Sequence, residues 1–264
     1  MKRLLIAAVV AGSLLPAAAG AQGQSELEHV PPDPPQNHVH DMSYADMVEM
    51  MGMDDRKKFA KVMLDRLEWR DADHGSQFAW DASAWYGGDF HKLWLQAEGE
   101  RGDGITGHSR LEGGWERIVS PWWSVRAGLR RDAGIGPARD WIGAGVAGLA
   151  PGFVETEASV YLGEDGRSAL RLKVERDFLF TQRLVLQPEL ELDAYGKDDP
   201  QKLIGAGLSD IALGLRLRYE LRREIAPYVG ISWNWRFGES ADLARAVGED
   251  DSEFTALAGL RVWF

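Results

Sequence analysis

The chain has 264 residues and a mass of 29.3 kDa, carries a formal net charge of −11 and contains no cysteine. The lack of cysteine excludes disulfide scaffolds, thiolate metal sites and cysteine nucleophiles. A chain this acidic is a poor candidate for binding the phosphate backbone of a nucleic acid, so we expect no nucleic-acid partner.

The first 21 residues have the three parts of a secretory signal peptide. Lys2 and Arg3 give a basic start, residues 4–15 an apolar run, and residues 19–21 a small-residue cleavage site. The mature chain is expected to begin at Gln22. The apolar run is too short to span a membrane and no other long apolar run follows, so helical membrane spans are not expected. An exported chain of this size without cysteine is typical of the bacterial periplasm or outer membrane.

Residues 22–60 are predicted to form a separate segment, either periplasmic or inside a lumen. A proline cluster at 31–35 is typical of an extended linker. Ser43 and Asp46 match a capping box, and Gly52 is expected to end the short helix that follows. One face of that helix carries three methionines at i, i+3, i+4 spacing: Met47, Met50 and Met51.

The same segment contains the residue types that bind soft metal ions. His38, His40 and Met42 alternate along an extended stretch, so three potential ligands share one side. Thioethers and imidazoles together suit Cu(I) and Cu(II) better than Mg²⁺ or Ca²⁺, and zinc is less well served without thiolates. The alternative is that the methionine face simply docks onto an apolar surface. The predicted copper ligands are His38, His40, Met42, Met47, Met50, Met51 and Met53.

From residue 61 onward the sequence alternates with a period of two, which predicts β-strands. In 208–221, for example, apolar residues at every second position oppose a face that includes Arg216, Arg218 and Glu220. Eleven strands are predicted in this way, at residues 78–86, 92–99, 107–119, 122–130, 141–149, 153–162, 169–180, 183–195, 208–221, 226–237 and 253–264.

Strand length separates the two closed-sheet folds that fit this pattern. A soluble barrel or sandwich packs its apolar face inside, whereas a transmembrane barrel has an apolar exterior and a polar lumen. Segments of about 10 residues favour the membrane barrel over soluble strands, which average about 5–6. Short turns also alternate with longer polar loops, as in outer-membrane proteins; the loops are 100–106, 131–140, 196–206 and 238–251.

Parity predicts a twelfth strand. The loop 238–251 is long and hence expected to be extracellular, which places the C-terminus, ending in Phe264, in the periplasm. Counting back requires one more strand at 62–70, with Met63, Leu67 and Trp69 on one face. The predicted fold is an all-β, transmembrane antiparallel β-barrel of about 12 strands over residues 61–264.

Opposite charges are expected to pair across the lumen wall, where they stabilise neighbouring strands. Arg176 falls on the lipid-facing side, and either snorkelling to the interface or a β-bulge would account for it. The predicted cross-strand pairs are Arg171 and Lys173 with Glu189 and Glu191, and Asp177 with Arg183.

Several local motifs carry a family resemblance that extends over most of the mature chain. They are residues 42–47 and 50–55, 85–89, 92–95, 98–100, 148–151, 184–188, 195–197 and 207–210. In these motifs the sequence resembles the outer-membrane copper resistance protein B family.

This resemblance implies a barrel preceded by a Met/His segment, with copper sequestered or passed outward across the cell outer membrane. It implies copper ions and outer-membrane lipid as partners, and periplasmic copper carriers or oxidases as further candidates. Many relatives carry long Met-His-Asp repeats before the barrel. Because this chain has only a short version, we expect a single site or a transfer role rather than storage of many ions.

Two other functions fit parts of the sequence. A general small-solute porin without specific metal binding would fit the fold, although a charge-filled lumen argues against a wide channel. A hydrolase would need a serine near a histidine, but His108 and Ser109 are adjacent and point to opposite faces, and no G-x-S-x-G motif is present. We therefore expect no enzyme. His108 with Glu112, on one strand face, is a candidate for a supplementary lumenal metal site.

Overall fold

The computed structural model describes residues 43–51, 57–72, 75–102 and 105–264. The chain divides into two units, residues 1–53 and 54–264. In the first unit, α1 spans Tyr44–Met51. Ser43 caps it as the capping-box pattern predicts: its hydroxyl accepts the Asp46 N–H at 3.2 Å and donates to the Asp46 carboxylate at 2.7 Å. The predicted signal peptide and proline-rich linker lie outside the described residues.

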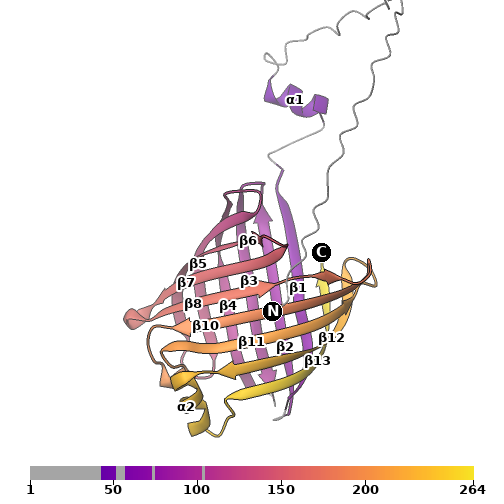
Figure 1. Ribbon diagram of the computed structural model, residues 1–264. Coiled ribbons are helices and arrows are strands. Elements are labelled where there is room, and N and C mark those ends of the chain that lie inside the picture. The colour runs from indigo at the N-terminus through magenta and orange to yellow at the C-terminus, as the bar shows by residue number, and fades with distance from the viewer. Residues whose placement is uncertain (1–42, 52–56, 73–74, 103–104) are drawn as a thin grey trace, which may run out of the picture. The chain divides into compact units, whose positions relative to one another are not determined.

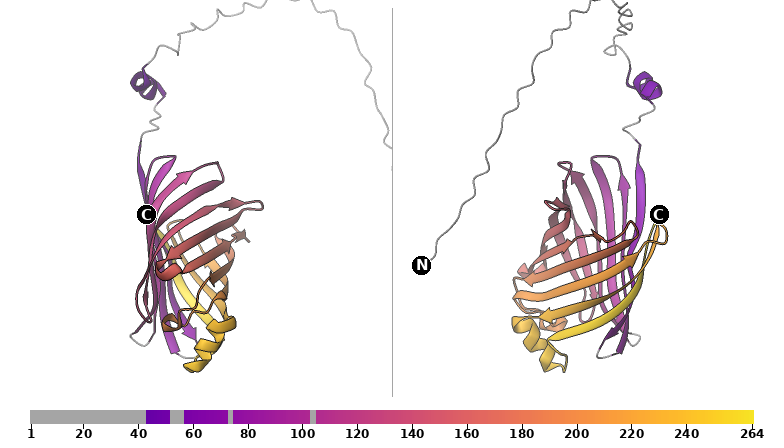
Figure 2. Two further views of the ribbon diagram at one scale, coloured as in Figure 1. Left: turned by 90° about the vertical axis from the view of Figure 1, so that its left-hand side faces the viewer. Right: turned by 45° about the vertical axis from the view of Figure 1, so that its right-hand side comes forward.

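The second unit is a closed antiparallel β-barrel (Figures 1 and 2). The strands pair in sequence order, except that β8 and β9 both pair with β10, and β1 (Phe59–Ala72) pairs with β13 (Ser252–Trp263) to close the wall. The strands between them are β2 (Gly75–Gly87), β3 (His91–Gly102), β4 (Ile105–Ile118), β5 (Trp123–Gly134), β6 (Arg139–Ala150), β7 (Val154–Gly163), β8 (Ser168–Glu175), β9 (Phe178–Leu179), β10 (Leu184–Tyr195), β11 (Gly207–Tyr219) and β12 (Ile225–Arg236).

The short β9 continues β8, so the wall has the twelve strands that the sequence predicts. β8 and β9 pair with β10 in the same register. Glu175, at the end of β8, lies opposite Glu189, and Phe178, at the start of β9, lies opposite Leu186. Between β8 and β9 the Arg176 N–H donates to the Pro188 carbonyl at 3.2 Å. Pro188 has no N–H, so the reciprocal hydrogen bond to the Arg176 carbonyl is missing. The unbroken register rules out a bulge. Arg176 therefore stays on the lipid side, with its guanidinium 4.6 Å from the centre of the Phe178 ring.

The two faces of the wall have the polarity of a membrane barrel. On β5, the outward Leu129 is 68% exposed while the neighbouring inward Arg130 is only 2% exposed. On β1, Glu68 is fully buried and the adjacent Trp69 is 60% exposed. A soluble protein would reverse this arrangement, because it buries leucine and tryptophan and exposes arginine and glutamate. Within the described ranges, no helix is long and apolar enough to cross a membrane.

The connections divide into a turn rim and a loop rim. The turn rim carries the start of β1, the end of β13 and the short links after β2, β4, β6, β9 and β11, whereas the loop rim carries the links after β1, β3, β5, β7, β10 and β12. One feature of the loop rim was not predicted: α2 (Gly238–Ala246) folds within the link between β12 and β13 (Figure 1). The Ser240 hydroxyl fixes α2 in place, because it accepts the Gly205 N–H at 2.8 Å and lies 2.7 Å from the Ser209 hydroxyl.

Candidate functional site

The barrel lumen is crossed by ion pairs that join strands far apart in the wall. Arg66 of β1 reaches β10, where one guanidinium nitrogen lies 2.8 Å from Glu189 and 2.7 Å from Glu191. Lys173 of β8 lies 3.8 Å from Asp81 of β2, six strands away in a wall of twelve. The middle of the lumen is therefore filled with charged side chains instead of open water.

Further pairs extend this arrangement around the lumen. Arg171 of β8 binds Glu98 of β3 at 2.9 and 3.1 Å and also Glu191 at 2.9 Å. Glu98 also accepts a hydrogen bond from Arg110 of β4 at 2.8 Å. We call the set the ion-pair belt; its members are Arg66, Glu68, Asp81, Glu98, Arg110, Arg171, Lys173, Glu189, Glu191 and Arg216.

Glu68 is the most deeply placed acid of the belt. Its fully buried carboxylate accepts hydrogen bonds from Arg216 at 2.7 Å, Arg70 at 2.9 Å and the Tyr228 hydroxyl at 3.2 Å. Removing one partner from such a buried pair leaves an uncompensated charge, which costs about 3–5 kcal/mol. Separating the ion pairs of the belt is therefore opposed by the cost of leaving buried charges without a partner.

The predicted cross-strand pairs are confirmed in part. Arg171 and Lys173 do lie against Glu189 and Glu191, with Lys173 3.7 Å from Glu189. The pairing predicted for Asp177 with Arg183 is wrong in the structure. Asp177 instead accepts a hydrogen bond from Arg218 at 2.7 Å. The reason is the register of β8–β10, which places position 177 opposite position 187 and away from 183.

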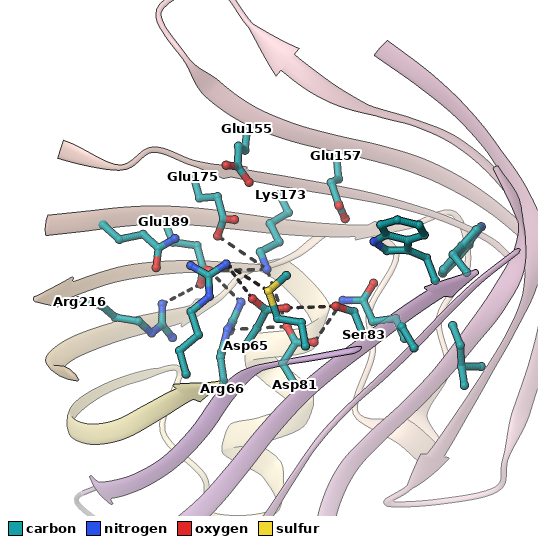
Figure 3. A pocket seen from close by; sticks show the side chains of 18 of the residues that line it. Asp65, Arg66, Asp81, Ser83, Glu155, Glu157, Lys173, Glu175, Glu189 and Arg216 are labelled. Carbon is teal, nitrogen blue, oxygen red and sulfur yellow. Dashed lines mark hydrogen bonds and ion pairs between the residues drawn. The ribbon is translucent and has the colours of Figure 1, made fainter. Parts of the chain in front are cut away.

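The lumen contains a cavity toward each rim. The turn-rim cavity, of about 270 Å³, contains Asp65 and Arg66 from β1 and Glu155 and Glu175 from β7 and β8, which enter it from facing walls (Figure 3). The loop-rim cavity is larger, about 780 Å³, and runs from the belt up to the chain that follows α2. Its lining contains twelve Asp and Glu residues against seven Lys and Arg residues. The larger cavity therefore has a net negative lining, which attracts cations.

The link between β10 and β11, residues 196–206, covers part of the loop rim. It reaches past β7 and β8 to the β5–β6 hairpin, where Arg139 donates to the Asp199 carboxylate at 2.7 and 3.1 Å. These hydrogen bonds hold the pKa of Asp199 below its ordinary value. Lys202 adds a hydrogen bond to the Ile135 carbonyl at 3.2 Å. Two contacts near the middle of the link thus hold it against the β5–β6 hairpin, and we call residues 196–206 the strap.

The first strand contains a β-bulge that the sequence pattern did not reveal. Leu64 pairs with Val262, but Leu67 pairs with Leu260, so Asp65 and Arg66 together occupy one position of the ladder. As a result, odd-numbered residues of β1 face the lumen before the bulge and even-numbered residues face it afterwards. Met63 was predicted to share a face with Leu67 and Trp69, and this is wrong: Met63 lines the turn-rim cavity, while Trp69 is exposed on the outside.

Of the predicted copper ligands, the structure describes those of α1. Met47 is half-buried, Met50 is 59% exposed and Met51 is 47% exposed. The other predicted ligands lie outside the described residues: His38, His40, Met42 and Met53. Among the described residues, no group of three or more His, Asp or Glu side chains is arranged to hold a metal ion.

His108 and Glu112 face the lumen from β4, as the alternation predicts. His108 lines the loop-rim cavity, and Glu112 lines a small space of about 30 Å³ beside the belt. They therefore border different spaces, and their supplementary metal site stays a prediction.

Comparisons with known proteins agree with this architecture. The family described as Copper resistance protein B precursor (CopB) matches residues 58–264. Copper resistance protein B of Escherichia coli is 45% identical over 203 residues, covering 77% of this chain and 69% of the relative. The Copper resistance protein B homolog of Pseudomonas syringae pv. tomato is 45% identical over 200 residues, covering 76% of this chain and 68% of the relative.

Among solved structures, the NanC porin is similar in fold. It has a TM-score of 0.51 at 14% identity, covering 77% of this chain and 99% of the porin. At that identity the similarity concerns the fold only, and it agrees with a barrel located in the outer membrane. The matches to the family and to its two relatives, together with the membrane barrel, show that this chain belongs to the copper resistance protein B family.

Proposed function

We propose that this chain binds copper ions through residues 38–53 and sequesters them or passes them outward across the outer membrane. The observation that carries the proposal is the exposure of the methionine face of α1. Within α1, Met50 and Met51 are about half exposed or more, so the helix itself leaves their thioethers accessible as soft-metal ligands. Membership of a copper resistance family supplies the identity of the metal.

The charge of the lumen supports a cationic cargo. The loop-rim cavity carries an excess of carboxylates, which raises the local concentration of cations in a narrow, low-dielectric space. Long loops of outer-membrane barrels face the outside, so we assign this cavity to the extracellular half. A cation leaving the periplasm would meet the turn-rim cavity first, then the ion-pair belt, and then this acidic chamber.

The ion-pair belt argues against the alternative of a general small-solute porin. Arg66 and Lys173 cross the lumen to carboxylates on distant strands, which leaves no wide aqueous channel. We expect conductance in planar bilayers to be far below that of an open porin, both for the mature chain and for a variant that lacks residues 22–60. A large, steady conductance in either protein would favour the porin.

Calorimetric titration tests the role of the segment. Purified protein is titrated with Cu(I) under anaerobic conditions and with Cu(II), beside a variant in which the predicted segment ligands are replaced by alanine. We expect the variant to bind at least one equivalent of copper fewer than the wild type. Equal binding by both proteins would remove the segment from the function. The replaced residues are His38, His40, Met42, Met47, Met50, Met51 and Met53.

A further inference from the structure

We propose that Met63 and Asp65 form a Cu(I) site in the turn-rim cavity, and that the guanidinium of Arg261 fills this site when copper is absent. The inference rests on the proposed function for the identity of the ion. It adds a site inside the barrel wall, separate from the segment of residues 38–53.

The bulge in β1 builds this site. Without an extra residue in the ladder, Met63 would face the lipid together with Leu67, and only one of Asp65 and Arg66 would face the lumen. Because of the bulge, the Met63 thioether, the Asp65 carboxylate and the Arg66 guanidinium all face the lumen at one level of the wall. Bulges commonly re-aim side chains at functional positions. Charged side chains such as Arg66 and Glu155 line the cavity beside Trp85, Trp94 and Leu95, so the methionine faces a largely polar space.

The sulfur of Met63 and an oxygen of Asp65 converge on one positively charged nitrogen. Arg261 Nη2 lies 3.5 Å from Met63 Sδ and 3.1 Å from Asp65 Oδ1. The second oxygen of Asp65 is held by the Ser83 hydroxyl at 3.2 Å, which fixes the orientation of the carboxylate. A soft and a charged ligand are therefore already aimed at a point where a cation sits.

The guanidinium is bound incompletely, which makes it replaceable. Arg261 Nε is buried and has no hydrogen-bond partner. An unsatisfied buried donor carries a cost, so moving the guanidinium away forfeits less than it would from a fully bonded site. The carboxylates of Glu155 and Glu175 line the same cavity and can receive the displaced cation.

The chemistry of this site favours Cu(I) over other ions. A thioether is a soft ligand that binds Cu(I) in preference to Mg²⁺ or Ca²⁺. Exchange of the guanidinium for Cu(I) leaves a single positive charge beside the Asp65 carboxylate, and Glu155 and Glu175 offset the charge of the guanidinium that moves toward them. A divalent ion would place two positive charges at that point, beside Arg66. Met63 also follows Met53 by ten residues in the chain and lies near the turn rim, where β1 begins.

The test measures Cu(I) binding by the full chain in detergent, in anaerobic competition with a chromophoric Cu(I) chelator, and repeats it with redox-inert Ag(I). The starting protein is the variant with all seven segment ligands replaced, so that only lumenal binding remains. We expect it to keep about one equivalent of Cu(I). Met63→Leu in that background should weaken the affinity at least tenfold, and Arg261→Gln should strengthen it about threefold by removing the competing cation.

A matched control separates ligation from packing. The double variant Met63→Leu, Leu64→Met keeps the number of thioethers and moves the sulfur to the lipid face, so it should bind as weakly as Met63→Leu alone. Circular dichroism and heat-modifiable gel mobility check that each barrel is folded. The lumenal site would be overturned if the folded variant with all seven segment ligands replaced bound no Cu(I), or if it bound Cu(I) equally with and without Met63→Leu. Failure of the segment proposal is a different result, because there the wild type and the variant with all seven segment ligands replaced would bind equal amounts of copper.

Discussion

Replacing Arg66 by methionine tests whether the ion-pair belt holds the barrel together. The substitution replaces the stem of the side chain but leaves Glu189, Glu191 and Asp81 without the guanidinium that lies 2.8, 2.7 and 3.8 Å from them. These groups are buried, so the loss should cost about 3–5 kcal/mol. With an unfolding slope of about 2 kcal/mol per molar urea, the urea midpoint should fall by about 2 M.

The assay is reversible urea unfolding in lipid vesicles, followed by tryptophan fluorescence. Arg131→Met is the matched control, because Arg131 pairs with Asp140 at 3.0 Å while both side chains are more than half exposed. Exposed pairs contribute about 0–1 kcal/mol, so this control should unfold near the wild-type midpoint. Glu191→Gln added to Arg66→Met should recover part of the loss. Equal midpoints for Arg66→Met and Arg131→Met would refute the idea that the buried pairs stabilise the barrel.

Three further predictions follow from the wall and the rim. The double variant Arg66→Ala, Arg171→Ala should open the belt and raise single-channel conductance in planar bilayers severalfold; unchanged conductance would mean that other side chains close the lumen. Pro188→Ala should restore the missing N–H of the ladder and raise the free energy of unfolding by about 0.5–1.5 kcal/mol, measured in urea. Because Arg139 lowers the pKa of Asp199, the Asp199 carboxylate stays charged and anchors the strap at neutral pH, and it releases the strap only as the pH falls below the range in which an ordinary aspartate titrates. Asp199→Asn should therefore expose residues 196–206 to protease at pH 7, whereas wild-type protein should resist protease from pH 7 to pH 5.

The strands and their faces could be predicted because alternation is a local property. In 208–221 the polarity of each residue indicates which face of the strand it occupies, and the barrel confirms that Arg216 and Arg218 point inward. The bulge escaped this reasoning because Met63, Leu67 and Trp69 look like one face when strict alternation is assumed. A signal was present: Asp65 and Arg66 are consecutive charges within a strand, and both cannot face the lumen unless the ladder gains a residue.

The belt and α2 depended on information that the sequence does not carry locally. Arg66 meets Glu191 only because the sheet closes through β1 and β13, and the tilt of the strands decides which levels meet across the lumen. The helix α2 lies in a loop without alternation, and it is held by contacts of Ser240 with the distant Gly205 and Ser209. The copper ligands of the segment stay a prediction.

Closure through the first and last strands also constrains how the barrel is made. The N–H of Phe264 and the carbonyl of Val62 form the final seam at 2.9 Å, and the reciprocal bond measures 3.1 Å. A polypeptide that lacks β13 would leave β1 and β12 as unpaired edge strands, whose peptide groups have no partner in hydrocarbon. We therefore expect insertion to require β13, so a nonsense mutation just before residue 252 should be as damaging to assembly as an early one.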